Sequence, residues 1–201
     1  MADHDPIAGR TDEELARQAR AGSRRSFEEL ANRYKRRLFA YLRPRLGSDQ
    51  DAEDAVQDTF LKLYRNIGSY DPSYRFSTWL YTSANRLAID AFRKGAAART
   101  MRAAKRIDDL PDPAAGGESA SRESGLWDAA RTLGEIRFRV LWLRYGEDMT
   151  IEEIAAVLGR TQLAVRALLH KARASLAGKL GPEMFRAARP SPEVARGAAG
   201  D

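Results

Sequence analysis

The sequence TIEEIAAVLGRTQLAVRALLHKAR, residues 150–173, decides the fold of the C-terminal part of the chain. Thr150 and Glu153 have the spacing of a capping box, in which each side chain accepts a hydrogen bond from the main-chain amide of the other residue. Gly159 suits the end of that first helix, and Thr161 can cap a second one. The stretch therefore predicts two consecutive helices separated by a short turn.

Three residues in this stretch have the sizes that a tight turn between helices requires. Ala155 permits close approach of the helices, Gly159 permits the turn, and Val165 fills the angle between them. The spacing predicts a helix-turn-helix, with a plain helical hairpin as the alternative.

The second of these helices is expected to be basic. Between Thr161 and Lys179 it contains no acidic residue. A helix of that charge fits the major groove of DNA, where its first residues reach base edges. His170 is expected at the surface or near a phosphate group rather than in a catalytic role. The candidate DNA-binding residues are Thr161, Gln162, Arg166, His170, Lys171 and Arg173.

Helical patterns also fill the N-terminal part of the chain. Capping-box patterns begin at Thr11 and at Ser26, and a further cap is expected at Ser48 or Asp49. Another helix is expected from about Ser77 to about Lys94, and no alternating strand pattern is evident. We therefore predict an all-α fold of two small helical domains. The predicted parts are an N-terminal helical domain (1–94), a flexible linker rich in Ala, Gly, Ser and Pro (95–125), a helix-turn-helix domain (126–180) and a disordered tail (181–201).

The predicted helix that starts near Asp51 has two distinct faces. Its apolar residues recur at helical spacing and should pack inward: they are Ala52, Val56, Phe60, Leu63 and Ile67. The opposite side combines carboxylates with one aliphatic group, which is typical of a protein-docking face; a solvated face is the alternative. The candidate docking residues are Asp54, Gln57, Asp58 and Leu61.

Aromatic and basic residues alternate between Tyr70 and Lys94. Rings that stack on unpaired bases, beside cations that hold phosphates, are typical of single-stranded nucleic-acid binding. Trp79 is expected in the core. For the three loop residues the sequence allows either core packing or contact with nucleic acid: Tyr70, Tyr74 and Arg75. The candidate residues are Tyr70, Tyr74, Arg75, Arg86, Arg93 and Lys94.

The composition limits the function classes. The 201 residues include 34 Lys and Arg against 28 Asp and Glu, no Cys and two His. The net charge of +6 is arranged in alternating basic and acidic blocks, which favours separate surfaces for separate partners, one of them a polyanion. Disulfides, thiolate metal sites and His-based triads are disfavoured, so we expect no catalytic residue, metal or cofactor. No apolar run reaches about 18 residues and no signal-peptide pattern is evident, so we expect a soluble, unsecreted protein.

A series of motifs resembles the extracytoplasmic-function (ECF) sigma factors of bacterial RNA polymerase. The motifs are DAEDAVQDTFLKL (51–63), FSTWLY (76–81), AID (88–90), IEEIA (151–155) and LHKAR (169–173). The resemblance covers about residues 26–180, with both domains in the family's order and the linker between them.

This resemblance implies a promoter-specificity subunit. The helix matching 51–64 would dock on the β' clamp helices. The segment matching 70–94 would open the -10 element and capture a flipped base, with Asn85 as a further candidate contact. The helix-turn-helix would read the -35 element as duplex and rest on the β flap. The implied partners are core RNA polymerase and promoter DNA, with an anti-sigma factor as a further candidate, no membrane, and a cytoplasmic location.

The sequence departs from the family pattern in both domains. Arg86 stands where the family usually has Asn, with Asn85 one position earlier. In the second helix of the C-terminal domain, Leu163, Ala164 and Leu168 replace Gly, Thr and a basic residue, which leaves Arg166 as the main candidate for a base contact. The tail has no counterpart.

Two other function classes are weighed against this interpretation. A stand-alone helix-turn-helix regulator needs a dimer interface to reach two half-sites, and no heptad pattern supplies one. An enzyme acting on nucleic acid needs carboxylates that bind metal, but the clustered Asp49, Asp51, Asp54 and Asp58 share one helix with Leu61 and suit docking better.

Overall fold

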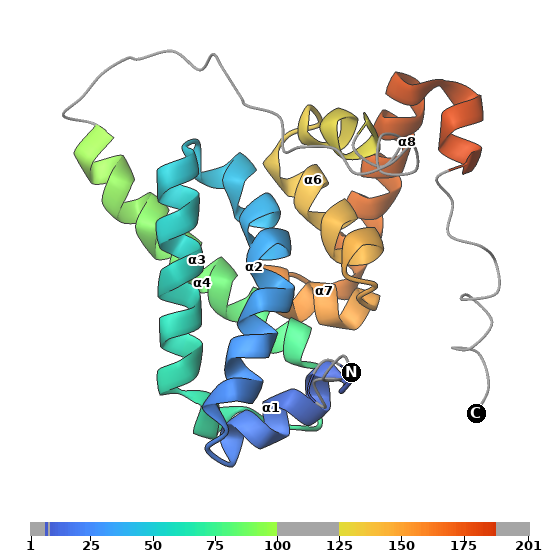
Figure 1. Ribbon diagram of the computed structural model, residues 1–201. Helices are drawn as coiled ribbons and strands as arrows, with labels where there is room; N and C mark the ends of the chain where they lie inside the picture. The colour runs from blue at the N-terminus through green and yellow to red at the C-terminus, as the bar shows by residue number, and fades with distance from the viewer. Residues whose placement is uncertain (1–6, 8, 100–124, 188–201) are drawn as a thin grey trace, which may run out of the picture. The chain divides into compact units, whose positions relative to one another are not determined.

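The computed structural model describes residues 7, 9–99 and 125–187, and the side chains of these residues except at 90–99 and 180–187. Every regular element in these ranges is helical, as predicted (Figure 1). The N-terminal elements are α1 (Asp12–Arg20), α2 (Arg24–Leu46), α3 (Asp49–Arg65), the short 3-10 helix η1 (Ile67–Ser69) and α4 (Phe76–Arg99). Residues 125–131 are helical, and after them come α6 (Glu135–Leu141), the π-helical turn η2 (Trp142–Gly146), α7 (Ile151–Leu158) and α8 (Gln162–Ala187).

Side-chain caps fix where the helices begin. The capping box at the start of α1 is confirmed, because the Thr11 amide donates to Glu14 at 2.9 Å and the Glu14 amide donates to Thr11 at 3.2 Å. The predicted capping box at Ser26 is wrong. Helix α2 begins one turn earlier, at the cap Ser23, whose hydroxyl accepts from the Ser26 amide at 3.3 Å. Ser26 itself is buried inside the first turn, so its hydroxyl is not at the helix terminus.

Helix α2 continues through Pro44 to Leu46, and Gly47, with a φ of +83°, ends it. The side chain of Leu46 is buried, and this packing keeps the last turn helical after the proline. Two helices extend further than the sequence indicates: α4 runs to Arg99 and α8 to Ala187. The rest of the predicted linker (100–124) and tail (188–201) lies outside the described residues.

The chain divides into two compact units. The first contains α1 to α4 and the segment Ala155–Arg160, which includes the second half of α7, and the second contains the remaining described residues, among them α6 and α8. In the first unit α2 packs against α1, α3 and α4. Leu30, Leu38 and Leu42 of α2 are fully or almost fully buried at this junction. Aromatic contacts join the helices, with ring centroids 4.9 Å apart for Tyr41 and Tyr81 and 5.6 Å apart for Tyr34 and Phe76.

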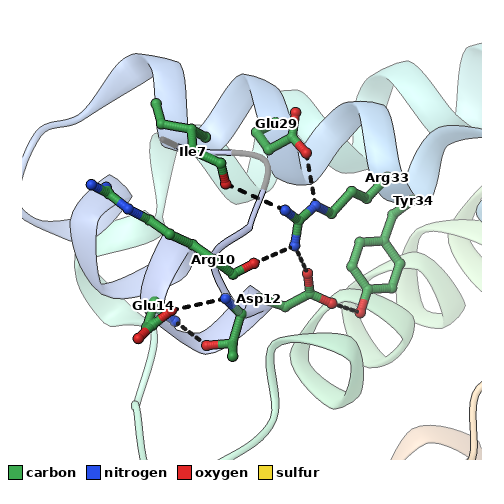
Figure 2. Close-up of polar contacts among 8 residues, drawn as sticks. Ile7, Arg10, Asp12, Glu14, Glu29, Arg33 and Tyr34 are labelled. Carbon is green, nitrogen blue, oxygen red and sulfur yellow. Dashed lines mark hydrogen bonds and ion pairs between the residues drawn. The ribbon is translucent and has the colours of Figure 1, made fainter. Parts of the chain in front are cut away.

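A polar cluster ties the start of α1 to α2 (Figure 2). The Arg33 guanidinium donates to Asp12, to Glu29 and to the main-chain oxygen of Arg10, each at 2.8 Å. The second carboxylate oxygen of Asp12 accepts from the Tyr34 hydroxyl at 2.6 Å. Burial alone would lower the pKa of Arg33, but the bonds to the two carboxylates hold that pKa above its ordinary value. This charged group is therefore fully paired while three-quarters of its side chain is removed from solvent.

The second unit has a core of its own. Trp127, Phe138 and Trp142 pack with ring centroids 4.8 to 6.2 Å apart, and α6 lies against α8. The small hydrophobic side chains Val165 and Ala172 of α8 are completely buried. Each unit thus builds its own apolar core, which is what positions the exposed faces described next.

Candidate protein-docking and nucleic-acid surfaces

Helix α3 has the two faces that its sequence predicts. Ala52, Val56 and Leu63 are buried. The outward side carries the four predicted docking residues, all of them exposed: Asp54, Gln57, Asp58 and Leu61. Leu61 is 53% exposed and lies among these polar side chains. The arrangement offers an apolar anchor within an acidic rim.

The structure adds Tyr64 to this face. The Tyr64 ring is 48% exposed. Its centroid lies 5.0 Å from that of the Phe27 ring on α2, so the two rings are in contact. Tyr64 was missed in the sequence, although its position three residues after Leu61 and seven after Gln57 places it on the same stripe. The predicted inward residue Phe60 is only half-buried and meets Phe27 edge-on.

The aromatic segment before α4 is divided between core and surface. Tyr70 was a candidate for nucleic-acid contact, but its ring is 1% exposed and packs 5.3 Å from Trp79 and 6.0 Å from Phe76. Burial raises the pKa of the Tyr70 phenol to about 12. The prediction that Tyr70 offers its ring to a base is therefore corrected, because the ring is buried against Phe76 and Trp79 and no face of it is open to a base.

Tyr74 and Arg75 remain on the surface, with Tyr74 63% exposed. The loop that presents them is held by local hydrogen bonds, one of them from the Tyr74 amide to the Asp71 carbonyl oxygen at 3.2 Å. The Tyr70 hydroxyl donates to the Tyr74 carbonyl oxygen at 2.7 Å. Asp71 accepts from the amide and the hydroxyl of Ser73, at 2.9 and 2.8 Å, and these bonds lower the pKa of Asp71. The exposed ring of Tyr74 thus sits on an ordered loop.

On α4 the neighbours Asn85 and Arg86 point to different sides. Arg86 is exposed, whereas the Asn85 amide oxygen accepts from Arg45 of α2 at 2.9 Å. Asn85 was a candidate base contact, but its side chain is engaged inside the helical unit rather than beside Arg86. Arg93 and Lys94 lie on α4, where the side chains are outside the described residues.

A capped turn leads into α8. The box at the start of α7 is confirmed, with the Thr150 amide donating to Glu153 at 2.8 Å and the Glu153 amide donating to Thr150 at 3.1 Å. Gly159 follows α7 with a φ of +62°, a conformation that glycine adopts without strain. The Thr161 hydroxyl then accepts from the Ala164 amide at 3.2 Å, as predicted.

Helix α8 buries one side and exposes the other. The buried residues follow the helical period: they are Val165, Leu169, Ala172 and Leu176. All six predicted DNA-binding residues are exposed: Thr161, Gln162, Arg166, His170, Lys171 and Arg173. The outward side therefore presents basic groups and hydrogen-bonding groups without an acidic residue between Gln162 and Lys179.

In the described parts of the chain, no three His, Asp or Glu side chains gather as a metal site would require. None of the helices described there combines the length and the apolar character that crossing a membrane takes.

Comparisons with known proteins match both units. The Sigma-70 region 2 family model matches residues 30–99, and the Sigma-70 region 4 model matches residues 125–176. The RNA polymerase sigma factor CarQ of Myxococcus xanthus is 32% identical, over 85% of this chain and 98% of its own length. The ECF RNA polymerase sigma factor SigW of Bacillus subtilis is 28% identical over 82% of this chain and 94% of its own length. The chain spans 64% of the length of the ECF sigma factor BldN of Streptomyces coelicolor, with 30% identity.

Solved structures agree with the fold. CnrH in complex with the cytosolic domain of CnrY has 28% sequence identity and a TM-score of 0.57, covering 83% of this chain and 95% of that one. The sigma factor RpoE of Bartonella quintana, in complex with the anti-sigma factor NepR, has 21% identity and a TM-score of 0.61 over 73% of this chain and 91% of that one. The likeness to RpoE supports the fold alone.

Proposed function

The chain belongs to the extracytoplasmic-function sigma factors of bacterial RNA polymerase, and from that membership we propose how its surfaces share the work of promoter selection. It directs core polymerase to promoters and initiates transcription. The observation that carries this function is the presence in one chain, in order, of regions 2 and 4 of the sigma-70 family. A stand-alone regulator is not favoured, because it would have no use for region 2.

The outward face of α3 is proposed to bind the β' clamp helices. Its residues are Asp54, Gln57, Asp58 and Leu61, with Tyr64 added. Leu61 and Tyr64 supply apolar area at the centre, and the carboxylates steer a basic partner toward it.

The loop before α4 and the exposed side of α4 are proposed to open the -10 element. Tyr74 supplies an exposed ring on which an unpaired base can stack, while Arg75 and Arg86 supply charge for the phosphates. Arg93 and Lys94 extend this basic path along the sequence of α4. Tyr70 acts from within the core by holding the loop, and Asn85 by joining α4 to Arg45.

The outward side of α8 is proposed to read the -35 element as duplex in the major groove. Gln162 and Arg166 lie in its first turns, where base edges are within reach, and Lys171 and Arg173 lie further along, where phosphates are closer. The Thr161 hydroxyl already accepts from the Ala164 amide, so Thr161 contributes mainly by fixing the start of the helix.

Residues 100–124, the part of the predicted linker that follows α4, are proposed to be a tether between the two DNA-binding units. As a random coil, these 25 residues average roughly 28 Å end to end, and the chain limit of about 85 Å is ample for a -10 and a -35 contact. Limited proteolysis is expected to cut first between Arg99 and Arg122. A single protected fragment across this segment would contradict the tether.

The proposed location is the cytoplasm, where core polymerase is found, and we propose no enzymatic activity of the chain's own. A regulatory protein that covers the sigma factor is a further proposed partner, because CnrH was solved with the cytosolic domain of CnrY and RpoE with an anti-sigma factor. Such a partner would be found by affinity purification of the full chain from its own cells and would block transcription by the purified holoenzyme.

Reconstitution tests the function directly. Core RNA polymerase mixed with the full chain is expected to bind and transcribe a subset of promoters selected from genomic DNA, whereas core alone and the chain alone do neither. Sequence-specific DNA binding by the isolated chain, without any association with core, would favour a stand-alone regulator instead.

A further inference from the structure

We propose that Leu163, with Ala167 one turn later, reads the methyl group of a thymine in the -35 element, so that this chain selects a T·A pair by apolar contact. The inference rests on the proposed function of α8 and names a specificity-determining residue within it. Leucine stands here where the family more often has glycine, so the contact would be particular to this chain.

Leu163 lies at the centre of the outward side of α8. The buried residues Val165 and Leu169 define the inward side. At about 100° per residue, Leu163 and Ala167 project almost opposite to them, and both are exposed. Leu163 is 76% exposed, more than any other large hydrophobic side chain that the structure describes. The fold gives this side chain no role in the core.

The surroundings of Leu163 favour DNA as the occupant. Arg160, Arg166 and Lys171 are exposed around it, and the sequence from Arg160 to Lys179 contains no acidic residue. A surface of that charge repels a basic protein partner and attracts a polyanion. An apolar side chain in the middle of such a surface will be buried when the helix enters a groove.

The chemistry of the major groove then specifies the target. Base pairs present hydrogen-bond donors, acceptors and one apolar group, the C5-methyl of thymine. Leu163 can neither donate nor accept through its side chain, so the thymine methyl is the base-edge group that it contacts favourably. Arg166 is three residues along, on an adjacent part of the exposed side, and can contact a neighbouring base pair at the same time.

Uracil substitution removes the methyl group and nothing else. A -35 element is first selected from a random library by holoenzyme containing the full-length chain, and each thymine is then replaced in turn by uracil. For the wild-type holoenzyme, uracil at one position is expected to lower the affinity about fourfold, the factor that corresponds to one buried methyl group. In Leu163→Ala holoenzyme the same replacement should change the affinity by less than about twofold. Leu163→Met, which keeps an apolar side chain of similar reach, should retain the dependence.

Each other outcome overturns the inference. Equal uracil effects in wild type and Leu163→Ala would assign the methyl contact to another residue, and a selected element without a T·A pair would remove the target. If Leu163→Ala weakens binding to core polymerase instead, the side chain serves a protein contact. Failure of the wild-type holoenzyme to select any -35 element would refute the proposed function itself, which the selection step reveals before any uracil is introduced.

Discussion

The hydroxyl of Tyr70 donates a 2.7 Å hydrogen bond to the main-chain carbonyl oxygen of Tyr74, so a buried ring holds the backbone of an exposed one. Tyr70 is enclosed by Phe76 and Trp79, which fixes the position of its hydroxyl. The loop is therefore anchored to the core of the first unit at the point where it presents Tyr74.

Tyr70→Phe is expected to slow promoter opening while leaving closed-complex binding unchanged. The variant keeps the buried ring but loses one hydrogen bond, worth about 1 kcal/mol, so the Tyr74 loop becomes less well positioned. Open-complex formation should fall roughly fivefold in a permanganate footprinting assay. A template already unpaired at the -10 element should restore the wild-type rate, and persistent slowness on that template would contradict a positioning role.

The stability of the first unit is expected to fall at alkaline pH through Tyr70. The pKa of this phenol is raised from about 10 in the unfolded chain to about 12 in the folded protein. Folding therefore favours the protonated form, whose stabilising contribution is complete below pH 10 and is lost as the pH rises toward 12. Urea unfolding at several pH values should show this loss in the wild type and a smaller one in Tyr70→Phe.

Asp58→Arg and Leu61→Ala are each expected to weaken binding to core polymerase by roughly tenfold, because they alter the rim and the centre of the outward face of α3. Fluorescence anisotropy of the labelled chain titrated with core gives the dissociation constant, and circular dichroism checks that helicity is unchanged. Leu163→Ala is the control, since it removes an exposed leucine from the other unit, 76% exposed against 53% for Leu61. Unaltered affinity in both α3 variants would leave that face a solvated surface.

Arg166→Ala is expected to change promoter specificity, whereas Lys171→Ala is expected to change promoter affinity without changing specificity. Arg166 is one turn into α8, and its loss should remove about 1 to 3 kcal/mol of discrimination at one -35 base pair. Loss of Lys171 should lower the affinity of holoenzyme for all promoters by a similar factor. It should also reduce the slope of log affinity against log salt concentration by about 1. Transcription from a -35 library at two salt concentrations separates these effects. Equal weakening of every promoter by both variants would make Arg166 a phosphate contact and transfer base readout to Gln162.

Arg33→Ala is expected to lower the free energy of unfolding by about 2 kcal/mol, because it leaves the partly buried carboxylates of Asp12 and Glu29 without their guanidinium partner. Arg24→Ala removes an exposed i,i+4 pair with Glu28 and should cost less than about 0.5 kcal/mol. Chemical denaturation of both variants provides the comparison. Equal losses would mean that the cluster shown in Figure 2 adds nothing beyond a surface ion pair.

The helical periods could be read from the sequence because burial on a single helix repeats every 3.6 residues. The outward stripe of α3 and the outward side of α8 follow from that rule alone, without knowledge of the neighbouring helices. Tyr64 obeys the same rule, so its place on the outward stripe of α3 could have been predicted from its spacing to Leu61. Local pattern therefore predicts which side of a helix a residue occupies.

Three predictions were wrong because the position of the side chain is set by residues far away in the sequence, or because two local patterns compete. Asn85 lies beside Arg45, 40 positions earlier, and no spacing in the sequence reveals that contact. Tyr70 precedes α4 in a loop, where no helical period separates core from surface. At the start of α2, Ser23 and Ser26 are both residues of a type that caps helices, and only the structure shows that Ser23 is the cap and that Ser26 is buried in the first turn.

On α8 the residues that maintain the fold and the residues proposed to contact DNA lie on opposite sides of the helix, and this affects how promoter preference can evolve. Leu163, Ala167 and His170 are exposed, so substitutions there cost little folding free energy, usually within about 0.5 kcal/mol. Val165 and Leu169 maintain the fold independently of them. After gene duplication, a copy of this chain can therefore acquire a new promoter preference by single exposed substitutions without first acquiring stabilising ones, and the same freedom is available for engineering sigma factors that do not cross-react.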